Sequence, residues 1–201
     1  MKDIGAALNR INLWLTSSGG EFAFNTGASS DEIAELESEI GLNLPDDLKR
    51  YLSIYDGEAH ISDGIIGNWK LMDYKWIGEC FLQHNTYLRD GIFGDNTNKS
   101  TPYVKGFWWN PKWIPIVSSE SGHYHCIDLD PNNDGELGQI ILFLHDADNR
   151  FLIARSLSEW FLKIADDLDR GIYKLADDNG YLIFNNEAFM WSSIEGKDLY
   201  D

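Results

Sequence analysis

The sequence has only two cysteines, few basic residues and no long apolar run. Cys80 and Cys126 are far apart, so neither a disulfide framework nor a thiolate zinc site is expected. Two isolated thiols suit a reducing compartment, and we expect a cytoplasmic protein. No segment approaches about 18 consecutive apolar residues, so no membrane-spanning helix is expected. Polar residues interrupt the first 20 positions, so no signal peptide is expected either.

Basic residues are scarce relative to acidic ones. The chain has 16 Lys and Arg against 33 Asp and Glu, a formal net charge of −17. Phosphate contacts need Lys and Arg, so we expect no nucleic-acid partner and no binding to anionic membranes. A negative field can instead attract a basic partner, although it also serves solubility, and both explanations stay open. The excess acid lies in residues 31–60 and 121–201.

The apolar spacing predicts helices in the first half of the chain and one more near its end. Ser29 with Glu32, and Ser156 with Glu159, form capping-box patterns that mark two helix starts. Pro45 suits the first turn of another. The predicted helices span 3–16, 29–41, 45–57, 72–88 and 156–168.

A meander of short strands is predicted between the fourth and fifth helices. A long loop, 89–106, precedes it. The predicted strands are Lys112–Val117, His123–Leu129, Gln139–His145 and Arg150–Arg155, with a short strand near Ile65–Ile66 and a hairpin around Asp177–Gly180. We therefore expect one α+β domain over 1–201, in which helices pack around a central, mostly antiparallel sheet, with the N-terminal helix 3–16 and the segment 174–201 as appended parts.

Two patterns resemble parts of metal sites. Asp130, Asn132, Asp134 and Gly135 match the first half of a calcium loop, but the twelfth position is Ile141 and a strand follows. A turn explains the same residues, and weak ion binding there stays open.

His123 and His125 share one face of a predicted strand, as zinc ligands do, with His145 or Asp128 as conceivable third ligands. We expect half-buried sheet residues instead, and therefore predict no metal and no cofactor. The chain also lacks the GxSxG, Walker and GxGxxG motifs, so no catalytic residues are predicted and no enzyme is expected.

Tryptophans gather beside the long loop. Trp108, Trp109 and Trp113 surround the start of the proline-containing strand. Trp113 is expected in the core, and at least one of the other two is expected to be partly exposed, where Trp can anchor a partner.

Four segments in order resemble one family. They read LESEIGLNLPDDLKRYLSIYDG, NPKWIPIVSS, HYHCIDLDPNNDGELGQIILF and RFLIARSLSEWFLKIADDLDRG. Over about residues 33–173 the chain resembles the SUKH superfamily, and specifically its Smi/Knr branch of yeast cell-wall glucan-synthesis regulators and bacterial relatives. The matching positions are Leu44, Pro45, Gly57, Trp113, Pro115, Asp128, Gly135, Gly138 and Ser156.

This resemblance implies a binding protein rather than an enzyme. Bacterial members are mainly immunity proteins that neutralise toxins, many of them nucleases. We therefore expect an immunity protein whose partner is a cognate toxin with a basic surface. The alternatives are a regulatory scaffold for cell-wall or glucan synthesis and a small-ligand or carbohydrate-binding domain. The candidate partner-binding residues are Asp56, Glu58, Trp108, Trp109, Asp128, Asp130 and Asp134.

Overall fold

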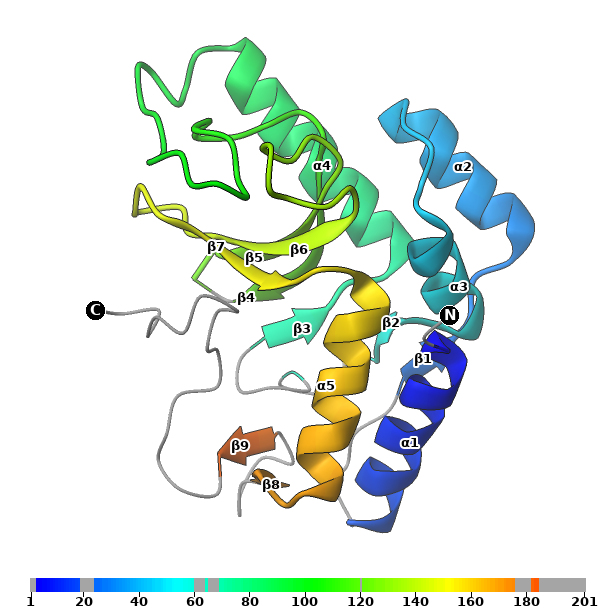
Figure 1. Cartoon of the computed structure of the whole chain (residues 1–201). Helices are drawn as coiled ribbons and strands as arrows, with labels where there is room; N and C mark the ends of the chain where they lie inside the picture. The colour runs from blue at the N-terminus through cyan, green and yellow to red at the C-terminus, as the bar shows by residue number, and fades with distance from the viewer. Residues whose placement is uncertain are drawn as a thin grey trace.

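The computed structural model describes residues 3–18, 24–59, 64, 69–119, 121–175 and 182–184. Within these residues the chain is an α+β protein with helices around an antiparallel sheet, as predicted (Figure 1). The helices are α1 (Ile4–Ser17), α2 (Ser30–Ile40), α3 (Asp46–Ile54), α4 (Tyr74–Arg89) and α5 (Leu157–Asp169).

The central sheet has the strand order β3-β4-β5-β6-β7, and every neighbouring pair in it is antiparallel. Two further pairs, β1 with β2 and β8 with β9, lie outside it. The strands are β1 (Phe24–Thr26), β2 (Tyr55–Glu58), β3 (Trp69–Leu71), β4 (Trp113–Ser119), β5 (Tyr124–Asp128), β6 (Gln139–Phe143), β7 (Arg150–Ala154), β8 (Tyr173–Leu175) and β9 (Leu182–Phe184).

Side-chain caps begin the helices where the sequence predicts them. Ser29 and Glu32 form the reciprocal capping box of α2, and the Ser156 side chain accepts from the Glu159 backbone N–H at the start of α5. Asp73 caps α4 in the same way, by accepting from Trp76.

The third helix is shorter than predicted. It ends at Ile54 rather than near Gly57. Residues Tyr55–Glu58 form β2, which pairs with β1, a strand that was not predicted from the sequence. A three-residue strand carries too little periodicity to be recognised, and its pairing with a distant segment overrides helix continuation. The strand predicted near 65–66 and the turn predicted at 177–180 lie outside the described residues, although β8 and β9 pair as a hairpin would.

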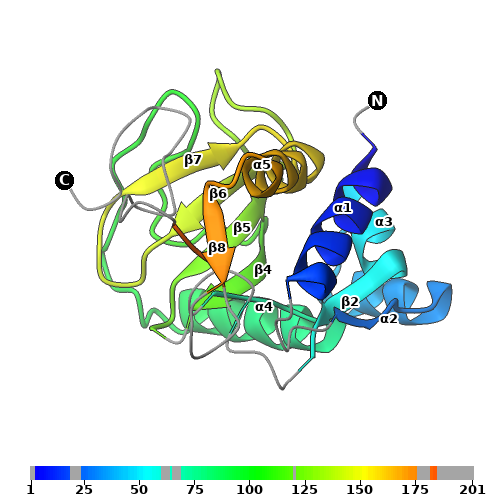
Figure 2. The same cartoon turned by 90° about the horizontal axis from the view of Figure 1, so that it is seen from below.

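Helices cover both faces of the central sheet. On β5, Tyr124 contacts Cys80 and His84 of α4, whereas the next residue, His125, contacts Trp160 of α5. Because successive side chains of a strand point to opposite faces, α4 and α5 lie on opposite sides, as Figure 2 shows. All residues of β4 to β7 are therefore buried. Helix α1 packs against α5, and α2 packs against α4.

No helix in the described part of the chain combines the length and the apolar character that crossing a membrane requires.

Candidate binding surface

The long loop docks on the turn between β5 and β6, so two groups of candidate residues lie together. Lys105 places its Nζ 2.7 Å from Asp130 Oδ1, and the Asn110 amide donates to Asp130 Oδ2 at 3.0 Å. The backbone N–H of Asp134 donates to the Pro102 carbonyl, also at 3.0 Å. The acidic turn therefore holds in place the segment between α4 and β4, which includes the long loop and, after it, Trp108 and Trp109.

The turn does not have the arrangement of a calcium loop. Both carboxylate oxygens of Asp130 accept hydrogen bonds, one from Lys105 and one from Asn110. The side-chain amide of Asn132 donates to the Thr101 carbonyl at 2.6 Å, so this side chain also faces the loop. A calcium loop instead gathers its oxygens around one ion, and here they are used to fix the turn.

The tryptophans occupy different environments. Trp109 is 2% exposed, donates its indole N–H to Asn85, and packs against His84. Burial removes Trp109 from the surface a partner could contact. Trp113 is fully buried, as expected. Trp108 is partly exposed, also as expected, and its ring lies over the Arg150 guanidinium.

Two acidic candidates are buried as well. Asp128 is fully buried and accepts hydrogen bonds from the Gln139 amide and the Asp130 backbone N–H. Its burial raises the pKa of the carboxyl group. Glu58 is 7% exposed and accepts from the Leu71 backbone N–H at 2.9 Å, which joins β2 to β3. Both carboxylates therefore organise backbone and are not available to a partner.

Asp56 lies on a different part of the molecule from the β5–β6 turn. It belongs to β2, next to β3, and β3 pairs with the second half of β4, whereas the turn lies at the first half. Asp56 Oδ1 accepts from the Tyr74 backbone N–H at 2.8 Å. Burial raises the pKa of its carboxyl group to about 6. The structure therefore does not bring the two groups of candidate acids together.

Three exposed carboxylates lie together on α2. Asp31, Glu35 and Glu39 are exposed, and their spacing of four residues places them in one stripe along the helix. None of the three forms an ion pair within the described residues. We call these three residues the acidic stripe. None of the three is among the candidate residues named from the sequence.

Other acidic residues are neutralised by pairing. Arg10 of α1 bridges to Asp166 and Asp169 of α5. Arg155 lies 2.7 Å from Glu136. These partners are far apart in sequence, so their neutralisation could not be predicted from charge spacing. The acidic stripe, by contrast, is a group of exposed carboxylates without an ion pair within the described residues.

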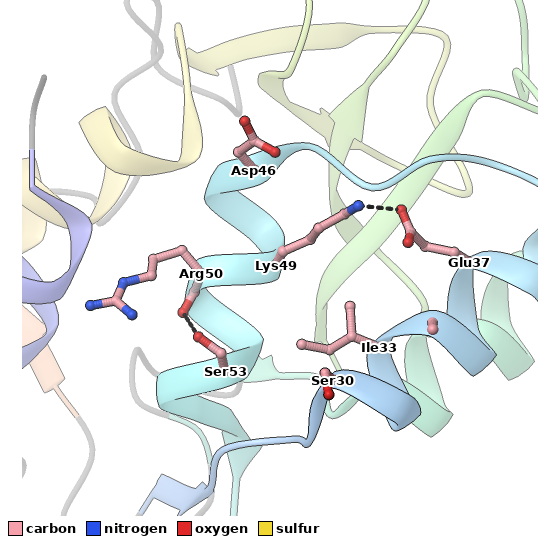
Figure 3. A pocket seen from close by; sticks show the side chains of 8 residues that line it. Ser30, Ile33, Glu37, Asp46, Lys49, Arg50 and Ser53 are labelled. Atoms are coloured by element: carbon pink, nitrogen blue, oxygen red, sulfur yellow. Dashed lines mark hydrogen bonds and ion pairs between the residues drawn. The ribbon is translucent and has the colours of Figure 1, made fainter.

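A groove of about 500 Å³ lies between α2 and α3 (Figure 3). Ile33 and Ala34 supply apolar surface, and Lys49 reaches across to Glu37 at 2.7 Å. Arg50 points away from this ion pair. The lining of the groove comes from two helices that folding brings together, so the groove was not predicted from the sequence. The lining residues are Ser30, Ile33, Ala34, Glu37, Asp46, Lys49, Arg50 and Ser53.

His123 and His125, which are two residues apart, have different surroundings. His125 is fully buried between Trp69 and Trp160, and this burial lowers its pKa to about 3. His123 instead lies beside His145, which is exposed.

Comparison with known proteins gives the family. Residues 27–163 match the model of the SMI1 / KNR4 family (SUKH-1), which is more than half of the chain. The chain belongs to this family. The resemblance seen in the sequence motifs is thereby confirmed, and several motif residues have structural roles, such as Pro45 at the N-cap of α3 and Trp113 in the core.

Named SMI1/KNR4 relatives are fungal regulators. The "Glucan synthesis regulatory protein" of Neurospora crassa is 24% identical over 89% of this chain and 41% of its own length. The "Cell wall assembly regulator SMI1" of Saccharomyces cerevisiae is 23% identical over 90% of this chain and 45% of its own. The "Cell wall biosynthesis/cell cycle regulator smi1" of Schizosaccharomyces pombe is 28% identical over 84% and 37%, respectively. The chain thus spans less than half the length of these relatives.

Proposed function

We propose that this SMI1/KNR4 domain is a non-enzymatic binding protein that acts in the cytoplasm by covering the basic surface of another protein. The observation that carries the proposal is the acidic stripe of Asp31, Glu35 and Glu39, exposed on α2 in a chain of net charge −17. Carboxylates without a partner in the free protein can attract and orient a basic surface. The names of the relatives, which describe regulators, support binding rather than catalysis.

The partner that we propose first is a cognate toxin. A nuclease toxin is basic where it holds phosphate, so an acidic protein can occupy that cleft and block it. The α2–α3 groove lies on another side of α2 from the stripe, and its Ile33 and Ala34 offer apolar surface on which the aliphatic part of a Lys or Arg side chain can rest. This chain would then be an immunity protein.

Regulation of cell-wall or glucan synthesis is the second candidate. It is favoured by the names of the fungal relatives and by matches that span 80–90% of this chain. No comparable observation favours a carbohydrate-binding domain, because Trp109 is buried and Trp108 covers Arg150.

Co-expression with the product of the adjacent open reading frame tests the proposal and separates the candidates. For an immunity protein, the neighbour is toxic when expressed alone, and co-expression restores growth and yields a stable complex. A wall-stress phenotype on deletion, without a toxic neighbour, would favour regulation. Absence of both phenotypes and of any co-purified protein would contradict the binding role.

The acidic stripe provides the matched test of the surface. The variant Asp31→Asn/Glu35→Gln/Glu39→Gln should fail to restore growth, since it keeps the helix and removes three charges. The control Asp95→Asn/Asp134→Asn instead removes exposed charge outside α2, at two acids that form no ion pair within the described residues. Equal protection by both variants would contradict the assignment to α2.

A further inference from the structure

Two histidines from neighbouring turns meet at one end of the central sheet. His123 precedes β5 and His145 follows β6, and their Nδ1 atoms lie 3.2 Å apart. Asp146, the next residue, places Oδ1 3.9 Å from the His123 Nδ1. One ligand atom from each residue lies within 4.8 Å of the others, and in the described part of the chain this is the cluster suited to holding a metal ion. We propose that His123, His145 and Asp146 form a binding site for a divalent transition metal, with Zn²⁺ as the best-fitting ion.

The nitrogen spacing matches tetrahedral zinc. Two imidazole nitrogens, each about 2.0–2.1 Å from a tetrahedral Zn²⁺, are about 3.3 Å from one another. The observed 3.2 Å separation is therefore already that of two ligands on one ion. Asp146 is exposed on a turn, so a side-chain rotation suffices to bring its carboxylate into the third position.

The donor set selects the kind of metal. Imidazole favours Zn²⁺, Cu²⁺ and Ni²⁺, whereas Ca²⁺ and Mg²⁺ prefer oxygen ligands throughout. Three protein ligands leave a fourth position for water or a partner's side chain, because His145 and Asp146 both face solvent. The buried thiols of Cys80 and Cys126 are not accessible competitors for the ion.

The surroundings of His123 hold its ring in position. Its side chain is partly buried, with the ring stacked near Trp69, and its backbone N–H donates to the Ser119 hydroxyl. The backbone N–H of His145 lies 3.3 Å from His123 Nδ1, so this nitrogen presents a lone pair, as a metal ligand must. Metal binding would replace that long hydrogen bond and join the β4–β5 turn to the β6–β7 turn.

Zinc titration of the full chain, without a polyhistidine tag and after chelator treatment, tests this site. Competition with a chromophoric chelator should show one Zn²⁺ bound per chain at pH 7.5, with weaker binding at pH 5.5 because the ligating imidazoles must be unprotonated. Thermal unfolding with and without Zn²⁺ should show a higher Tm when the ion is bound.

Matched variants locate the ion. His145→Ala should weaken Zn²⁺ binding at least tenfold and abolish the Tm increase, and Asp146→Asn should weaken it less. Asp148→Asn is the control, because Asp148 lies on the same turn but pairs with Lys99 at 3.2 Å. Circular dichroism checks that each variant is folded. Undiminished binding by folded His145→Ala, or no binding at a tenfold molar excess of Zn²⁺, would overturn the proposal.

Discussion

His125 shows how burial determines the chemistry of a single residue. In the sequence it pairs with His123 as a metal-ligand pattern, but in the structure it is fully buried between two tryptophan rings. Burial lowers its pKa to about 3, so the imidazole stays neutral in the folded protein near neutral pH. The strand alternation and the helix over 156–168 were predictable, but the packing of that helix over this face of the sheet was not.

The folded pKa of His125 lies below its unfolded value, so its neutral form contributes stability above about pH 6.5. This contribution is lost as the pH falls toward 3, because the unfolded chain binds the proton first. His125→Phe should therefore flatten the decline of the unfolding free energy between about pH 6 and 4, by up to about 1.4 kcal/mol per pH unit. Urea unfolding across this range measures the slope. Equal slopes in both proteins would contradict the buried, neutral assignment.

Asp56 gives the opposite dependence of stability on pH. Its folded pKa of about 6 lies above the ordinary value of 3.8, so its stabilising, protonated form is lost as the pH rises through 6. Asp56→Asn keeps an oxygen for the Tyr74 N–H and removes the partly buried charge. We expect a gain of about 1 kcal/mol at pH 8 and no difference below pH 3.8, measured by urea unfolding. Destabilisation at pH 8 would show that the charge itself is needed.

At the scale of elements, most boundaries were predictable because local signals and tertiary contacts agree. The capping box of Ser29 and the Pro45 turn mark α2 and α3 correctly, and the observed strands β4 to β7 lie within two residues of their predicted ends. The pairing of β1 with β2 was not predictable, since it depends on a short strand and a distant partner. The α2–α3 groove arises from the same kind of distant contact.

Gly57 is where β2 is packed against the start of α4. It has φ of +71°, and an added Cβ would lie 2.5 Å from the Asp73 backbone nitrogen. Gly57→Ala should destabilise the fold by about 3 kcal/mol or more, since backbone must move as well as adopt a strained conformation.

Gly41 provides the matched control for this clash. Its φ is +69°, but nothing lies within 4 Å of an added Cβ. Gly41→Ala should cost only about 1 kcal/mol, the price of the left-handed conformation. Chemical denaturation of both variants measures the difference, and equal losses would show that the close approach at Gly57 is absent.

At the scale of the whole molecule, the acidic residues that the structure describes divide into those that are buried or paired with a base and those that are exposed without an ion pair. Arg10 and Lys105 pair with acids more than twenty residues away, which sequence spacing does not reveal. The candidate residues chosen from sequence therefore included carboxylates that serve the fold, such as Asp128. The charge balance and family motifs predicted a binding protein, but the placement of its accessible acids required the structure.

The affinity of the co-expressed partner for the acidic-stripe variant tests the central claim most directly. Titration calorimetry would compare the native chain, Asp31→Asn/Glu35→Gln/Glu39→Gln and the control Asp95→Asn/Asp134→Asn at low and high salt. The account predicts a 1:1 complex that weakens at least tenfold in the stripe variant, less in the control, and with rising salt. Unchanged affinity in the stripe variant, or binding insensitive to salt, would contradict it.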